Sequence, residues 1–96
     1  MDKIKIRTLV DDSIKNINEI LGNNQKISTD RNNEITGINS RIDSTIFLNL
    51  ILEIEKKIFE SYDIEINILD NLSENLYAKF TLGDLENLII KMLNDV

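Results

Sequence analysis

Helical spacing of the apolar residues constrains the fold of this 96-residue chain more than any other feature. Over residues 3–21, 44–62 and 82–93, apolar side chains recur in steps of three and four, which places them on one face of a helix. The stretch over 44–62 is apolar around most of its circumference, so we expect a central helix with neighbours on more than one side. These stretches predict an all-α fold.

The ends of the first and last helices also have sequence signals. Gly22 follows the first helix directly, and we expect it to adopt the left-handed conformation that often ends helices. Thr81 precedes the last helix and Asp84 lies three residues further on, which is the spacing of a capping box with Thr81 as N-cap.

The segments between the long helices complete the predicted architecture. Residues 73–79 are expected to form a short helix. Ile64, Ile66 and Ile68 alternate with polar residues, but we expect a buried extended connector because no convincing second strand could pair with them. The prediction is one domain over residues 1–96, an all-α four-helix bundle of three long helices and one short helix.

A long loop is predicted between the first and second helices. Residues 22–43 are rich in Asn, Ser, Thr and Gly, and single isoleucines among them are expected to hold the loop to the core. Because the loop has few apolar contacts, we expect residues 22–42 to be more mobile than the helices. Loops of about 20 residues are uncommon in compact domains and often have a function.

The residue types that the chain lacks exclude several kinds of chemistry. It has no Cys and no His, so it can form neither a disulfide, nor a Cys-ligated zinc site, nor a Ser-His-Asp triad. No general base or carboxylate pair of a hydrolase can be recognised either. Any metal site would have to use oxygen ligands alone, and we expect a protein that is not itself an enzyme.

Acidic residues outnumber basic ones and are concentrated in the second part of the chain. The net charge is -6, and residues 43–96 hold eleven acidic against four basic groups. Binding to nucleic acid requires a basic surface, so we expect no nucleic-acid partner; the acidic part favours partners with basic docking patches. Because the sequence shows no membrane-spanning stretch and no apolar signal segment, we expect a cytoplasmic protein without membrane insertion. We also expect a monomer.

Ser44 lies where the long polar loop meets the start of the predicted central helix. The first turn of a helix has unpaired N–H groups and the positive end of the helix dipole, so a phosphate attached to this serine would be stabilised. Asp and Ser are also common N-caps, and Asp43 or Ser44 could serve only in that way. Ser40 is a weaker candidate for attachment, because no helix begins immediately after it.

Four short segments occur in an order that is typical of one family. They are Gly37-Ile38, Ile42-Asp43-Ser44-Thr45, Tyr62-Asp63-Ile64-Glu65-Ile66 and Phe80-Thr81-Leu82-Gly83-Asp84-Leu85. Together they resemble the acyl carrier protein family, in which an Asp-Ser-Leu motif opens the second helix. The resemblance covers most of the chain and implies an acyl-carrier-like bundle. It also implies a carrier of acyl or aminoacyl groups, held as thioesters on a 4′-phosphopantetheine arm. Such a carrier needs no metal site of its own, because the arm supplies the thiol and partner enzymes perform the chemistry.

The resemblance assigns roles to residues at and after the start of the second helix. Ser44 would hold the 4′-phosphopantetheine, which a phosphopantetheinyl transferase takes from coenzyme A, and Asp43 would contact that transferase or its metal ion. The docking surface for the transferase and for acyl-loading and acyl-processing enzymes would include Thr45, Ile46, Glu53 and Glu55. For the last three of these, core packing or simple solvation is the alternative.

Several positions depart from the family pattern and suggest a specialised carrier. Thr45 stands where the family usually has Leu, a residue that helps the transferase to grip the carrier, and Ile42 stands where it usually has Gly. The second helix is also about one turn, or four residues, longer than is typical. The cargo stays open among fatty acyl, polyketide, aminoacyl and D-alanyl groups.

Two other functions are compatible with the sequence. The departures at Ile42 and Thr45 favour an unmodified helical protein–protein interaction module with the carrier fold. An acidic regulator of a nucleic-acid-binding protein has only the net charge in its favour.

Overall fold

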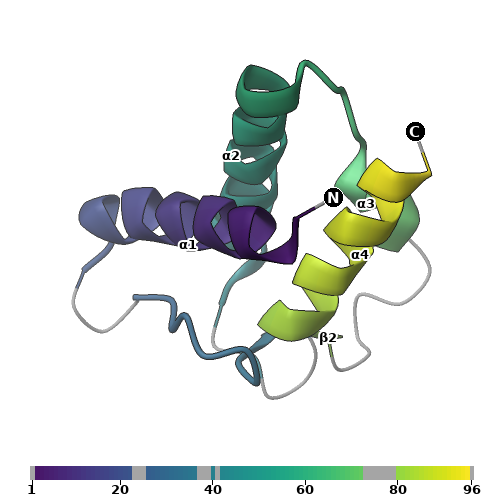
Figure 1. Ribbon diagram of the computed structural model, residues 1–96. Helices are drawn as coiled ribbons and strands as arrows, with labels where there is room; N and C mark the ends of the chain where they lie inside the picture. The colour runs from purple at the N-terminus through teal and green to yellow at the C-terminus, as the bar shows by residue number, and fades with distance from the viewer. Residues whose placement is uncertain (1, 23–25, 37–39, 41, 73–79, 96) are drawn as a thin grey trace.

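Four helices and a short two-stranded sheet make up the part of the chain that the computed structural model describes, residues 2–22, 26–36, 40, 42–72 and 80–95. In chain order the elements are α1 (Lys3–Ile20), β1 (Glu34–Thr36), α2 (Ser44–Tyr62), α3 (Ile68–Leu72), β2 (Phe80–Thr81) and α4 (Leu82–Asn94). The protein is mostly helical, as predicted. α1 contacts both α2 and α4, and Figure 1 shows α1 lying across the upright α2.

Apolar side chains, most of them from the three long helices, form the core. The buried apolar residues of the helices are Ile6, Leu9, Val10 and Ile14 in α1, Phe47, Leu50, Ile51, Ile54 and Ile58 in α2, Ile68 in α3, and Leu82, Leu85, Ile89 and Leu93 in α4. Ile27 and Ile35 of the loop complete the core, so single isoleucines do hold this loop to the helices, as predicted. Among the described helices, none combines the length and the apolarity needed to cross a membrane.

The two strongest helix predictions are confirmed. α2 spans residues 44–62, the limits that the apolar spacing predicts. α4 begins with the predicted capping box: the Thr81 hydroxyl accepts from the Asp84 N–H at 3.1 Å, and Asp84 Oδ2 accepts from the Thr81 N–H at 2.9 Å. Residues 64–67 form the predicted connector without pairing as a strand, although its isoleucines are half-buried rather than buried.

The end of α1 differs from the prediction. Gly22 does not adopt a left-handed conformation. Leu21 caps the helix in an extended conformation, with φ -82° and ψ 151°, and its N–H donates to the Ile17 carbonyl at 3.3 Å. The helix therefore ends by a turn into extended chain, which requires no glycine.

The short helix α3 begins earlier in the chain than predicted. Ile68, which the alternating pattern places in the connector, is buried and begins α3. Two side chains accept from backbone N–H groups at this start: Glu55 Oε2 from Ile68 at 2.8 Å, and Asn67 Oδ1 from Asp70 at 3.2 Å. The Glu55 contact comes from another helix, so local sequence does not reveal it. The predicted helix over 73–79 lies outside the described residues.

A short antiparallel sheet forms where the sequence predicts no strand. β1 pairs with β2, with Glu34 opposite Thr81 and Thr36 opposite Phe80 and an irregularity in register between them. Only Ile35 of β1 is buried. The all-α prediction is therefore wrong at this point. One buried residue in a strand of three gives no alternation by which the sequence could reveal the strand.

Polar contacts as well as isoleucines hold the described part of the loop in place. Asn18 of α1 binds the backbone of Ile27 twice: Oδ1 accepts from the Ile27 N–H at 2.7 Å, and Nδ2 donates to the Ile27 carbonyl at 3.0 Å. The expectation of mobility over residues 22–42 rested on scarce apolar contacts alone. With these bonds, we expect residues 26–36 to be as ordered as the helices.

The same loop also contacts the start of α4. The Leu82 N–H donates to the Asn33 carbonyl at 2.8 Å, and the Gly83 N–H donates to the Arg31 carbonyl at 2.9 Å. A Cβ on Gly83 would lie 3.1 Å from the Arg31 carbonyl oxygen, so the absent side chain allows the close approach. The loop thus satisfies backbone donors that the first turn of α4 leaves unpaired.

Replacing Asn18 with alanine is expected to lower the free energy of unfolding by about 1–3 kcal/mol, because the buried Ile27 backbone loses its partners. Asn16→Ala is the matched control, since exposed Asn16 donates one hydrogen bond to Glu53 at 3.2 Å on the surface. Its effect should stay within about 0.5 kcal/mol. Urea denaturation measures both values, and equal effects would contradict the role given to Asn18.

Candidate functional site

Asp43 and Ser44 lie at the first turn of α2, as the sequence predicts. Asp43 is the N-cap, with φ -72° and ψ 164°, and its Oδ1 accepts from the Ile46 N–H at 2.9 Å. The Asp43 carbonyl accepts from the Phe47 N–H at 2.9 Å, which starts the helical bonding pattern. Caps of this kind typically contribute about 1 kcal/mol, so Asp43 has a structural role whatever else it does.

Ser44 is the first residue of α2 and its side chain is exposed. Within the described part of the chain, no hydrogen bond engages its hydroxyl. The hydroxyl is thus open to an incoming reagent at the positive end of the helix dipole. No residue in the first turn of α2 is acidic, and the N-cap Asp43 places a carboxylate directly before Ser44.

The predicted docking residues do not form one surface. Thr45 is exposed beside Ser44, whereas Ile46 is half-buried and packs against the core. Glu53 accepts from Asn16 Nδ2 at 3.2 Å and lies 3.8 Å from Lys57 Nζ.

Glu55 accepts from the Ile68 backbone, so its carboxylate is also engaged inside the fold. Glu53 and Glu55 are two residues apart on α2, or about 200° around the helix. They therefore point to nearly opposite sides and cannot face one partner together. The structure brings together the predicted residues 43–45 but separates them from both glutamates.

Three exposed apolar residues of α2 escaped the sequence analysis. Leu48, Leu52 and Phe59 are 41%, 51% and 48% exposed. The sequence does indicate them, because the apolar residues of 44–62 cover most of the circumference of the helix. That feature predicts neighbours on more than one side, and α2 has them: Glu53 accepts from Asn16 of α1, and Glu55 accepts from the start of α3. A further side of α2 leaves the three apolar residues exposed.

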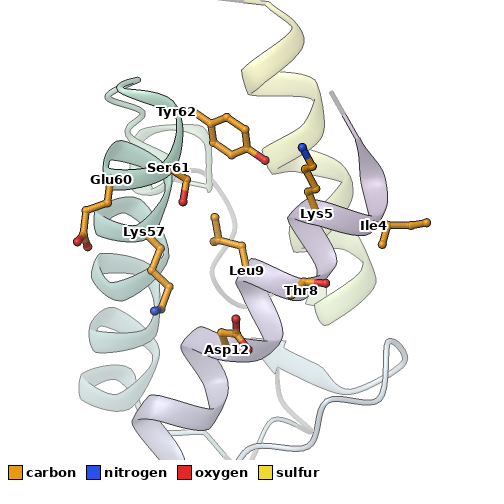
Figure 2. Close-up of a pocket in the computed structure, with 9 residues that line it drawn as sticks. All are labelled: Ile4, Lys5, Thr8, Leu9, Asp12, Lys57, Glu60, Ser61 and Tyr62. Atoms are coloured by element: carbon orange, nitrogen blue, oxygen red, sulfur yellow. The ribbon is translucent and has the colours of Figure 1, made fainter.

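A groove of about 530 Å³ lies between the first half of α1 and the last turns of α2. Figure 2 shows Leu9 pointing into the space between the two helices and the Tyr62 ring at one end of it. Its charged lining is balanced: the residues are Lys5 and Lys57 against Asp12 and Glu60. Lys57 is the groove residue of α2 nearest in sequence to Ser44, and 13 residues separate them, so the two sites are about 20 Å apart along α2.

An ionic cluster around the buried carboxylate of Glu86 joins α1, the loop and α4. Glu86 is 1% exposed, and its Oε2 lies 3.0 Å from Arg31 Nε and 3.4 Å from Arg7 Nε. Arg31 Nη2 also contacts Asp11 Oδ1 at 2.8 Å. The sequence analysis missed Glu86, although its spacing from Leu82 and Ile89 places it on the apolar face of α4.

Comparisons with known proteins add no assignment. No family model matches this chain, and no curated protein or solved structure is similar enough to count as a match. Any assignment of function therefore rests on the sequence segments described above and on the geometry around Ser44.

Proposed function

We propose that this protein carries acyl or aminoacyl groups as thioesters on a 4′-phosphopantetheine arm attached to Ser44, and presents them to partner biosynthetic enzymes. The observation that supports this proposal is the position of Ser44: an exposed serine in the first turn of α2, directly after the N-cap Asp43. The ordered sequence segments around residues 44, 64 and 82 resemble those of acyl carrier proteins and point to the same function.

The residues at the start of α2 suit a phosphodiester. An arm attached through Ser44 Oγ would place its phosphate beside the first N–H groups of α2, where the helix dipole favours negative charge. The arm would supply the thiol that the chain lacks, since it has no Cys. The protein's own contribution would be to present the serine on a rigid helix, while a transferase and acyl-processing enzymes perform the chemistry.

Treatment with coenzyme A, magnesium and a broad-specificity phosphopantetheinyl transferase is expected to raise the intact mass by one phosphopantetheine group. Ser44→Ala should abolish the gain, because it removes the accepting oxygen. Ser40→Ala is the matched control: this half-buried serine lies four residues before Ser44, ahead of α2, and its Oγ accepts from the Ile42 N–H at 3.2 Å. A gain that survives Ser44→Ala, or no gain in the wild-type protein, would overturn the proposal.

Restoring the family's leucine with Thr45→Leu is expected to improve this modification, by about tenfold in kcat/KM. Thr45 is exposed beside Ser44, so a larger apolar side chain there can contact the transferase without disturbing the core. Steady-state kinetics with the same transferase would measure the change. Equal kcat/KM for Thr45→Leu and the wild-type protein would show that this position does not limit recognition.

An unmodified helical interaction module is the second candidate function. The exposed apolar residues on α2 favour it, because such residues on one helix are typical of a surface that binds another protein. Under this alternative the wild-type protein stays unmodified in the mass assay.

A further inference from the structure

The groove between α1 and α2 has opposite charges on its α1 side, with an apolar residue between them. Lys5 and Asp12 both line the groove, and both are exposed. They are seven residues apart, so their side chains point within about 20° of one another and are about 10 Å apart along the helix. Leu9, which lines the groove between them, is 9% exposed. The α1 side of the groove therefore presents a cation, an apolar side chain and an anion in a row.

Both charges are unpaired within the part of the chain that the structure describes. No ion pair or hydrogen bond there engages Lys5 or Asp12. At about 10 Å they are too far apart to pair with each other, since an ion pair requires about 4 Å. On the α2 side, by contrast, Lys57 lies 3.8 Å from Glu53, and Figure 2 shows the Glu60 carboxylate turned away from α1. Lys5 and Asp12 are therefore both available to a bound ligand.

The uncharged polar groups of the groove can form hydrogen bonds to the same ligand. Figure 2 shows the Tyr62 hydroxyl directed toward Lys5, so these two groups can contact one anionic group together. Exposed Thr8 and Ser61 supply one hydroxyl from each helix, and a hydroxyl can both donate and accept. Hydroxyls of this kind suit amide groups, which also have a donor and an acceptor.

The size of the groove and the spacing of its charges define the ligand. Its volume of about 530 Å³ is within the range of small-molecule sites, about 300–1,000 Å³. A span of about 10 Å corresponds to about three residues of extended peptide. A free amino acid is too short to contact both charges, because a single carbon joins its ammonium and carboxylate groups.

We propose that the groove binds a short zwitterionic peptide of about three residues. Its N-terminal ammonium contacts Asp12, and its C-terminal carboxylate contacts Lys5 and Tyr62. Successive side chains of an extended peptide point to opposite sides, so the central side chain can face Leu9 and is apolar. This site lies about 20 Å from Ser44 along α2, and the inference does not depend on the function proposed above.

Titration with the tripeptide Ala-Leu-Ala, followed through the backbone amide chemical shifts of the protein, tests the site. We expect the shifts of groove residues such as Thr8 and Ser61 to change. Acetylating the N-terminus or amidating the C-terminus of the peptide should each weaken binding about tenfold, because each removes one charge. Ala-Gly-Ala should also bind more weakly, because it lacks the central apolar side chain.

Matched variants assign each end of the peptide. Lys5→Gln should weaken binding of the free tripeptide about tenfold but leave binding of the amidated peptide unchanged, since that peptide has no carboxylate. Asp12→Asn should act in the same way on the free and the acetylated peptide. Lys15→Gln is the control, because Lys15 is exposed on α1 outside the groove, and it should leave the affinity unchanged.

Three results would overturn the inference. The first is the absence of shift changes at the groove when the free tripeptide is present at millimolar concentration. The second is equal affinity for the free and the blocked peptides. The third is an equal loss of affinity in Lys15→Gln and Lys5→Gln, which would indicate general attraction to a charged surface rather than a defined site.

Discussion

Replacing Arg31 with methionine is expected to lower the free energy of unfolding by about 3–5 kcal/mol. Glu86 is almost fully buried, and Arg31 is its closer cation, at 3.0 Å against 3.4 Å for Arg7. Without Arg31, a desolvated carboxylate would keep one longer contact, and its Oε1 already has no hydrogen-bond partner among the described residues. Asp11 would also lose its contact with Arg31 at 2.8 Å.

Arg7 provides a control, because it contacts the same Glu86 carboxylate from α1. Arg7 has a half-exposed side chain, so Arg7→Met should cost about 1 kcal/mol or less. The double variant Arg31→Met/Glu86→Leu removes the buried charge together with its partner and should recover part of the lost stability. Urea denaturation compares the variants. A double variant no more stable than Arg31→Met would show that packing by Arg31, rather than its pairing with Glu86, holds the loop.

Truncating the core of α2 with Ile54→Ala is expected to cost about 2–5 kcal/mol. Ile54 is fully buried in the middle of α2, so the change removes packed methyl groups and leaves a cavity. Leu52→Ala on the same helix is the matched control, because Leu52 is half-exposed and its loss should cost less than about 1 kcal/mol. Similar costs for the two variants in urea denaturation would contradict the orientation of α2 described above.

The long helices could be predicted because the residues that determine them lie close together in the sequence. Spacing in steps of three and four identified α2 to the residue, and the Thr81–Asp84 pair identified the start of α4. The β1–β2 sheet and the start of α3 depend on contacts between distant segments, such as Glu55 with the Ile68 backbone. Short-range patterns contain no information on such contacts, so the sequence analysis placed a loop and a connector there.

The candidate site was predictable in part for the same reason. The sequence places Asp43, Ser44 and Thr45 at a helix start, and a helix start is a local feature. Whether a glutamate on α2 faces solvent depends on its neighbours in space, and Glu53 and Glu55 have partners on α1 and at the start of α3.

The most direct test of the central claim is a thiol titration of the protein after treatment with coenzyme A, magnesium and the transferase, once excess reagent has been removed. Because the chain has no Cys, any thiol on the protein must belong to an attached group. The account predicts one thiol per chain in the wild-type protein and none in Ser44→Ala. No thiol in the wild-type protein, or an equal number in Ser44→Ala, would contradict it.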